Sequence, residues 1–181
     1  RYNHFALDAV MALRRAQPFE AGDVMRVRVT TIPFGERMAT EAPASMLGAK
    51  FSIPYAVAAA IVLGRTDHAA FEPPALGDPR IRELARKVEI RAEPTMSPRR
   101  TDHPTAHVKI ALSDGRVLEE TTTVPRGDAE NPVPAEEIAA KFLALAAPVL
   151  GELRARRAAD AVREVETVKD VSELAALLVP E

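Results

Sequence analysis

The segment from Ser52 to Leu63 limits the possible folds of this chain more than any other feature. It reads Ser-Ile-Pro-Tyr-Ala-Val-Ala-Ala-Ala-Ile-Val-Leu and is apolar almost all round. A helix of that kind is buried on most of its sides. Ser52 suits the N-cap, Pro54 is tolerated in the first turn, and Gly64 suits the C-cap. Because the apolar run is too short to span a bilayer, we expect a soluble domain folded around this helix.

Composition narrows the class of protein. The chain has 181 residues, of which 47% are hydrophobic and 28% charged, which is typical of one globular domain, alone or with an appendage. The formal net charge of -2 argues against a nucleic-acid partner, and no segment indicates a membrane partner. The absence of cysteine excludes disulfides, thiolate metal sites and a cysteine nucleophile. Without cysteine or a signal peptide, we expect a cytoplasmic location.

Hydrophobic periodicity places further elements before residue 94. It predicts a helix at 5–15, a strand at 23–32, a loop at 34–48, a helix opened by Asp78-Pro79 and a strand at 88–92. In the first strand, alternation places Met25, Val27, Val29 and Thr31 on one face. A basic, proline-rich loop at 94–104 follows.

Two strands at 105–113 and 116–124 are expected to form a hairpin. Asp114-Gly115 between them is typical of a two-residue turn with positive φ at both positions. That register pairs Lys109 with Glu120, which is favourable, but also sets Glu119 beside Ile110, which is not. A bulge or an edge position would resolve the conflict.

The composition changes near Pro134, after which every segment reads as helix. The first has Pro134 at its start and an apolar stripe of Ile138, Phe142, Leu145 and Val149; a charged helix at 154–166 and a short helix opened by Asp170 follow. We therefore predict an α+β fold: a small, mostly antiparallel sheet of three to four strands packed with helices at 1–133, then an all-helical tail at 134–181.

Few residues are placed for chemistry. His4 follows Arg1 at the start of an apolar helix, so a cation and a titratable base could hold a carboxylate and move a proton. Lys50 precedes a helix start whose free N–H groups could bind an anion. Ser52 lacks the surroundings of a nucleophile elbow, and its N-cap role is sufficient explanation. His103 and His107 share no helical face that would make a metal site. His68, beside Asp67 in an expected loop, is expected to be an ordinary surface residue.

Four segments together resemble the C-terminal part of the MmgE/PrpD family, which includes 2-methylcitrate dehydratase, cis-aconitate decarboxylase and iminodisuccinate epimerase. The first is similar to the family's C-R-x-x-H-x-x-I-D-A, and the second to its A-K-F-S-L-P-Y-x-V-A. The four segments are Arg1-Tyr2-Asn3-His4-Phe5-Ala6-Leu7-Asp8-Ala9, the stretch from Ala49 to Ala58, the Leu112–Arg116 hairpin, and the stretch from Pro125 to Pro132 with Glu137 and Lys141-Phe142 after it.

The resemblance implies an α+β lid, here residues 1–133, that closes an active site against a large all-helical domain. The C-terminal helices would pack on that helical domain, which this chain lacks. It also implies a homodimer that acts on di- or tricarboxylates with no metal or organic cofactor. Such enzymes remove a proton next to a carboxylate, then lose water, lose carbon dioxide or take a proton back. On the matching positions, His4 would be catalytic, and Arg1, Lys50 and Ser52 would bind substrate.

The chain also departs from the family pattern. The family's lid lysine, in a K-P-x-x-x-C stretch, would lie upstream of Arg1, and no initiator methionine opens the sequence. We therefore expect a part of a longer enzyme that has little activity alone. The favoured activity of the whole is dehydration of 2-methylcitrate. The alternatives are another activity of the family, or a non-catalytic assembly subunit that pairs with a separate helical chain.

Overall fold

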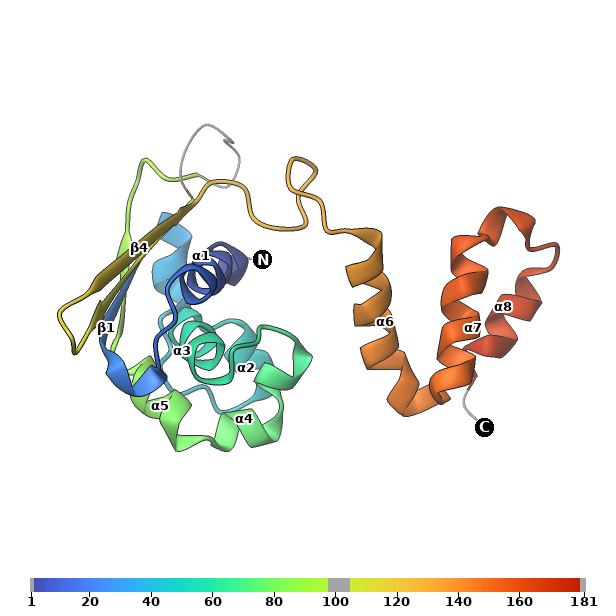
Figure 1. Cartoon of the computed structure of the whole chain (residues 1–181), viewed down its shortest axis with the longest axis horizontal. Helices are drawn as coiled ribbons and strands as arrows, with labels where there is room; N and C mark the ends of the chain where they lie inside the picture. The colour runs from blue at the N-terminus through green and yellow to red at the C-terminus, as the bar shows by residue number, and fades with distance from the viewer. Residues whose placement is uncertain (1, 98–104, 180–181) are drawn as a thin grey trace. The chain divides into compact units, whose positions relative to one another are not determined.

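The computed structural model describes residues 2–97 and 105–179 of the chain. The chain forms two compact units, Arg1–Asn131 and Pro132–Glu181, which are considered separately (Figure 1). Arg1, His103 and most of the expected loop at 94–104 lie outside the described residues.

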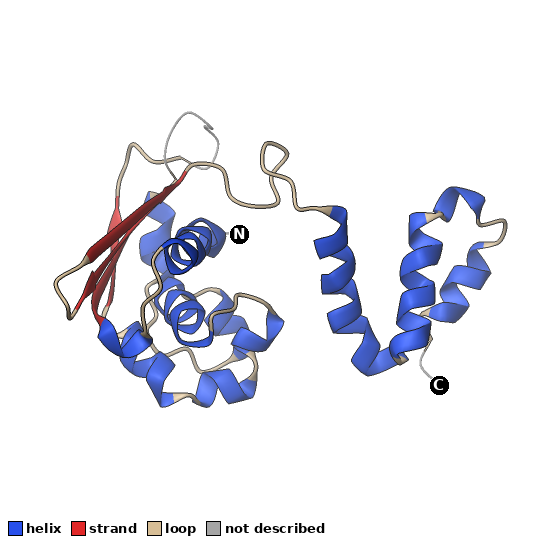
Figure 2. Cartoon of the chain, viewed as in Figure 1, coloured by secondary structure: helices blue, strands red, loops and turns tan. Residues whose placement is uncertain are grey.

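The first unit contains a four-stranded sheet in the order β2-β1-β3-β4. The strands are β1 (Val24–Thr31), β2 (Val88–Ala92), β3 (Ala106–Leu112) and β4 (Val117–Thr122). β1 pairs with β2 in parallel and with β3 antiparallel, and β3 pairs with β4 antiparallel. The helices of this unit lie on one face of the sheet (Figure 2). The predicted α+β class with a mostly antiparallel sheet is confirmed.

The helices of the first unit pack around the apolar segment that opened the sequence analysis. They are α1 (Tyr2–Ala16), α2 (Met46–Lys50), α3 (Ile53–Leu63), α4 (Pro73–Gly77) and α5 (Pro79–Ala85), with 3₁₀ turns at Ala21–Asp23, Pro33–Met38 and His68–Phe71. Every residue of α3 from Ile53 to Ile61 is buried. Ser52 is its N-cap, and Gly64 ends it with a φ of 66°, as predicted. The core therefore lies between α3, α1 and the sheet.

Tyr55 is the largest fully buried side chain of α3. Its hydroxyl donates a hydrogen bond to the carbonyl oxygen of Ala70, at 3.0 Å. Burial raises the pKa of this hydroxyl, and the negative charge of Asp78 adds to the rise. The tyrosine therefore ties the 3₁₀ turn at His68–Phe71 to the core.

Two local predictions were wrong. Met25 was expected on the same face as Val27 and Val29. Those two residues are buried, but Met25 is 61% exposed, because the pairing of β1 with β3 shifts between Val24 and Arg26 and this bulge turns Met25 outward. The segment 34–48 was expected to be a loop, but it holds a 3₁₀ helix and α2. Both are too short to produce a readable apolar period.

The hairpin has a different turn from the one predicted. A two-residue turn of the predicted type needs a positive φ at both Asp114 and Gly115. Among the described residues only glycines have a positive φ, so Gly115, at 88°, meets this requirement and Asp114 does not. Leu112 accepts from the Gly115 N–H and donates to the Arg116 carbonyl, which makes a three-residue loop with glycine in the left-handed position. The extra loop residue shifts the register, so Lys109 faces Glu119 instead of Glu120.

This register removes the conflict that the two-residue turn created. The Lys109 ammonium lies 2.6 Å from a Glu119 carboxylate oxygen, and Ile110 faces Leu118. Hydrogen bonding and charge from Lys109 hold the pKa of Glu119 below its usual value. The pairing of side chains across the strands therefore agrees with the loop length that the glycine sets.

The second unit consists of α6 (Ala135–Leu150), α7 (Glu152–Arg163) and α8 (Val171–Leu177), with a 3₁₀ turn at Val165–Thr167. Pro134 was expected to be the first residue of α6 but is its N-cap, so the helix starts one residue later. Gly151 separates α6 from α7. Asp170 caps α8 by accepting from the Ser172 N–H at 2.8 Å. Each helix in the described part of the chain is too short or too polar to cross a bilayer.

This unit has almost no interior. Among its described residues only Ala155 and Ala158 are buried. Ile138, Leu145 and Val149 of the predicted stripe are 59%, 50% and 63% exposed. An amphipathic helix gains most of its stability by burying such a stripe. Ile138, Leu145 and Val149 have no burying partner among the described residues of this unit.

Candidate functional site

The first turn of α1 is fastened to the segment that precedes α3. The side chain of Asn3 is only 6% exposed. Its amide nitrogen donates to the carbonyl oxygens of Lys50 at 3.0 Å and Ser52 at 3.4 Å. The helix turn that carries His4 and the backbone of two other candidate residues are therefore held together.

The four predicted site residues lie in different environments. His4 and Lys50 are exposed, on the first turn of α1 and at the last position of α2. Ser52 is fully buried. Arg1 lies outside the described residues. The structure thus brings the side chain of Asn3, the residue before His4, against the backbone of Lys50 and Ser52. The side chains of His4 and Lys50 are at the surface.

Ser52 uses its hydroxyl to build the start of α3. The oxygen accepts from the Tyr55 N–H at 3.0 Å, and the hydroxyl donates to the carbonyl oxygen of Thr40. Since the residue is 0% exposed, no part of it is open to a ligand in this structure. The described contacts are those of a helix cap.

Replacing Ser52 with alanine should therefore reduce stability and leave substrate binding unchanged. Loss of the cap and of the donor to Thr40 should cost about 2 kcal/mol of unfolding free energy, measured by urea denaturation. Ser45→Ala is the matched control, since Ser45 caps α2 through the Gly48 N–H but is exposed. It should cost about 0.5 kcal/mol. A rise in KM for the intact S52A enzyme, with stability unchanged, would contradict the cap role.

A second hydrogen bond joins α1 to the loop at residues 125–128. The Asp8 carboxylate accepts from the backbone N–H of Arg126 at 2.7 Å. Asn3 and Asp8 thus connect α1 to two other segments that are far away in the sequence. Sequence analysis missed both as site-building residues, although each is a polar side chain placed among the apolar positions of a helix.

Lys50 has a neighbour that the sequence had assigned to the surface. Its ammonium lies 3.5 Å from Nδ1 of His68. Nε2 of His68 lies 3.4 Å from a carboxylate oxygen of Glu72. No signal in the local sequence indicated this contact, because it joins α2 to a separate 3₁₀ turn.

Exposed apolar side chains lie close to His4 and Lys50 along the chain. The rings of Tyr2 and Phe34 are 4.7 Å apart, and both are partly exposed. Leu47 and Phe51, which flank Lys50 in sequence, are more than 60% exposed. A surface with two titratable side chains among apolar ones is typical of a site that another part of a protein covers.

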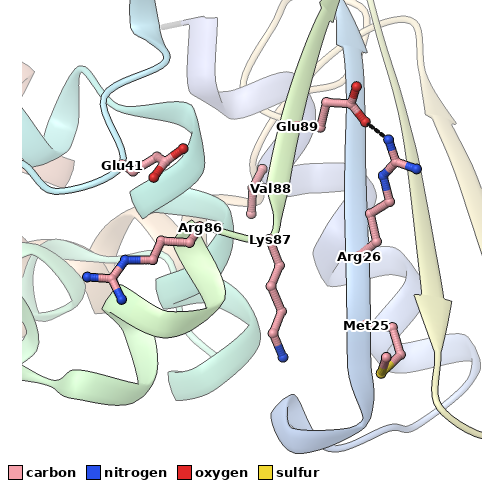
Figure 3. Close-up of a pocket in the computed structure, with 7 residues that line it drawn as sticks. All are labelled: Met25, Arg26, Glu41, Arg86, Lys87, Val88 and Glu89. Carbon is pink, nitrogen blue, oxygen red and sulfur yellow. Dashed lines mark hydrogen bonds and ion pairs between the residues drawn. The ribbon is translucent and has the colours of Figure 1, made fainter.

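A hollow of about 500 Å³ lies elsewhere in this unit, at the start of β1 and β2. Its residues are Met25, Arg26, Glu41, Arg86, Lys87, Val88 and Glu89 (Figure 3). Arg26 is paired with Glu89, Lys87 donates to the Val24 carbonyl at 2.9 Å, and Arg86 and Lys87 point in different directions. Because its charged groups do not converge, this hollow is the weaker candidate.

Among residues 2–97 and 105–179, no cluster of three or more His, Asp or Glu is placed to hold a metal ion. The candidate site comprises the side chains of His4 and Lys50. The backbone that carries them is held by the hydrogen bonds of Asn3, Ser52 and Asp8.

An α+β unit followed by a helical C-terminal part is the architecture expected of the resemblance, and comparison with known proteins gives the same family. The model of the MmgE/PrpD C-terminal domain matches residues 1–167. The chain belongs to the MmgE/PrpD family and comprises its C-terminal domain.

Two curated relatives match almost the whole chain. A cis-aconitate decarboxylase-like protein of Aspergillus oryzae is 27% identical over 188 residues, which cover 97% of this chain and 38% of the relative. The cis-aconitate decarboxylase of Mus musculus is 27% identical over 181 residues, which cover 97% of this chain and 37% of the relative. The chain thus spans less than two fifths of the length of these proteins.

Proposed function

We propose that this chain is the lid part of a cofactor-independent lyase that acts on a di- or tricarboxylate. The observation that carries the proposal is the junction at the start of α1. There, Asn3 joins the turn of His4 to the backbone of Lys50, so a base and a cation sit on one fixed frame. Family membership supports the same class of reaction. The remainder of the active site would come from a helical domain of the same protein, in a cytoplasmic homodimer.

The roles follow from the chemistry of removing a proton next to a carboxylate. The negative charge that develops there spreads onto the carboxylate, so a nearby cation lowers the barrier. Lys50 would supply that cation, and Arg1 would hold a second carboxylate. An imidazole titrates near neutral pH, so His4 would be the general acid or base. Ser52 would hold the backbone next to Lys50 in place through its cap of α3.

Two reactions are candidates for the whole enzyme. The sequence motifs favour loss of water from 2-methylcitrate. The names of both relatives favour loss of carbon dioxide from cis-aconitate instead. Both substrates carry three carboxylates, so the same cations would serve either reaction.

The test is a substrate panel on the intact enzyme. 2-Methylcitrate, citrate, cis-aconitate and iminodisuccinate would be supplied separately, with release of water, release of carbon dioxide and racemisation followed by NMR. We expect turnover of one tricarboxylate, without added metal and in the presence of a chelator. The 181-residue chain alone should show less than about one thousandth of the intact rate, since part of the catalytic machinery is missing. Activity abolished by the chelator, or no turnover of any of the four, would contradict the proposal.

A further inference from the structure

We propose that His68, oriented by Glu72, is a positioning residue that holds the Lys50 ammonium ready for a substrate carboxylate. This inference rests on the proposed function, since it assumes that Lys50 binds substrate. The sequence gives no hint of the contact, because Lys50 ends α2 and His68 opens a separate 3₁₀ turn.

The two contacts of the imidazole fix its tautomer. An ammonium group can only donate hydrogen bonds, so Nδ1 of His68, 3.5 Å from Lys50 Nζ, must be the acceptor. The ring proton of neutral His68 is then on Nε2, where the Glu72 carboxylate lies 3.4 Å away. Each nitrogen therefore faces a group of the complementary kind, and the carboxylate favours the tautomer that Lys50 needs.

Both ends of the contact stand on backbone that side-chain hydrogen bonds hold, one partly buried and one fully buried. Asn3 donates to the Lys50 carbonyl at 3.0 Å. Tyr55 donates to the Ala70 carbonyl at 3.0 Å, which fixes the turn that carries His68. A lysine side chain has many rotamers, and a neighbour that restricts them reduces the entropy lost when a ligand binds.

Lys50 also remains available for a ligand anion. Among the described residues it has no carboxylate partner, and its neighbour His68 is neutral when it accepts from the ammonium.

The histidine on β3 has similar contacts, but the lysine near it is not available for a ligand. His107 likewise has a polar partner on Nδ1, Thr121 at 3.0 Å, and a glutamate on Nε2, Glu119 at 3.5 Å. The adjacent cation, Lys109, is already paired with that glutamate.

Substitution of His68 by asparagine or glutamine distinguishes the role of Nδ1 from that of Nε2. Asparagine can place its oxygen near the position of Nδ1, whereas glutamine places its amide near Nε2 and leaves Lys50 without an acceptor. In the intact enzyme, H68Q and H68F should raise KM, and the dissociation constant of the unreactive tricarboxylate tricarballylate, roughly three- to tenfold. The value of kcat should stay within about twofold. H68N should restore both constants, and H107F should leave them unchanged.

The route through Lys50 is tested by combining substitutions. K50M should raise KM more than H68F does, and H68F should add nothing in the K50M background, because its target is gone. If K50M leaves KM and tricarballylate binding unchanged, the proposed role of Lys50 fails, and this inference fails with it. If K50M raises both constants but H68F does not, or if the two effects add, only the positioning role of His68 is overturned. Thermal unfolding of each variant shows whether a change reflects lost folding.

Discussion

Replacing Asn3 with aspartate should destabilise the chain by about 3 kcal/mol or more at pH 7. The two side chains have nearly the same shape, so packing is preserved. The substitution removes the amide donor that serves the Lys50 and Ser52 carbonyls. It also sets a carboxylate against two carbonyl oxygens in a site that is 6% exposed. Urea denaturation of N3D and of the wild-type chain would measure the difference in their free energies of unfolding.

The destabilisation by N3D should depend on pH with a defined sign. Burial without a donor raises the pKa of a carboxyl group in the folded state above its value in the unfolded chain. Between those two pKa values the folded state binds more protons, so stability falls as the pH rises. Below the unfolded value, near pH 4, both states are protonated, and the neutral acid can donate to one carbonyl. The difference between N3D and wild type should therefore be smaller at pH 4 than at pH 7.

Asn131 provides a matched control for the asparagine-to-aspartate change. Its amide nitrogen also donates to a backbone carbonyl, that of Val124 at 3.2 Å, but the side chain is exposed. N131D should cost no more than about 1 kcal/mol, since water can solvate the new carboxylate. If N3D and N131D destabilise the chain equally, or if the N3D penalty is the same at both pH values, Asn3 does not hold α1 as described.

The features that sequence could predict are those set by near neighbours. The caps of α3 depend on Ser52, Tyr55 and Gly64, all within one short stretch, and they were found where expected. The Asn3 contact could not be predicted because its partner is 47 residues away. Nothing in the sequence near Asn3 distinguishes an amide that donates to a distant carbonyl from one that faces water. The same holds for the contact of Lys50 with His68.

The hairpin error has a different origin. A loop of two residues and a loop of three both suit Asp114-Gly115, and the choice changes every pair across the strands. The poor match of Glu119 with Ile110 was a usable signal against the shorter loop. It was not decisive from sequence alone, because an edge strand would tolerate it, and β4 is an edge strand. The backbone at Asp114, which keeps a negative φ, decides for the longer loop.

For the second unit, the open question is what covers the exposed apolar stripe of α6. Its apolar stripe was read correctly as a helix face, yet the described residues of the unit leave that face exposed. The curated relatives are more than twice as long as this chain, since the match covers 37–38% of each. We infer that the face of α6 packs on another part of the whole protein, as the resemblance implies.

Two lysines in the α6 stripe should be tolerated by the chain alone but not by the whole enzyme. Ile138 and Leu145 are at least half exposed in this chain, so Ile138→Lys with Leu145→Lys should leave its unfolding free energy within about 0.5 kcal/mol and reduce its self-association. In the whole enzyme the same pair should cost roughly 3 kcal/mol or more and most of the activity, because two charges would be buried without partners. Thermal unfolding, light scattering and turnover check both halves.

The control places the same charge on the other side of the helix. Ala140 and Ala144 are exposed and, at 3.6 residues per turn, lie opposite the stripe. Ala140→Lys with Ala144→Lys should be tolerated in both contexts, since neither alanine belongs to the apolar face. If the Ile138 and Leu145 substitutions are also tolerated by the whole enzyme, the stripe does not pack on a helical domain, and the binding or assembly role with a separate chain becomes the better account of this unit.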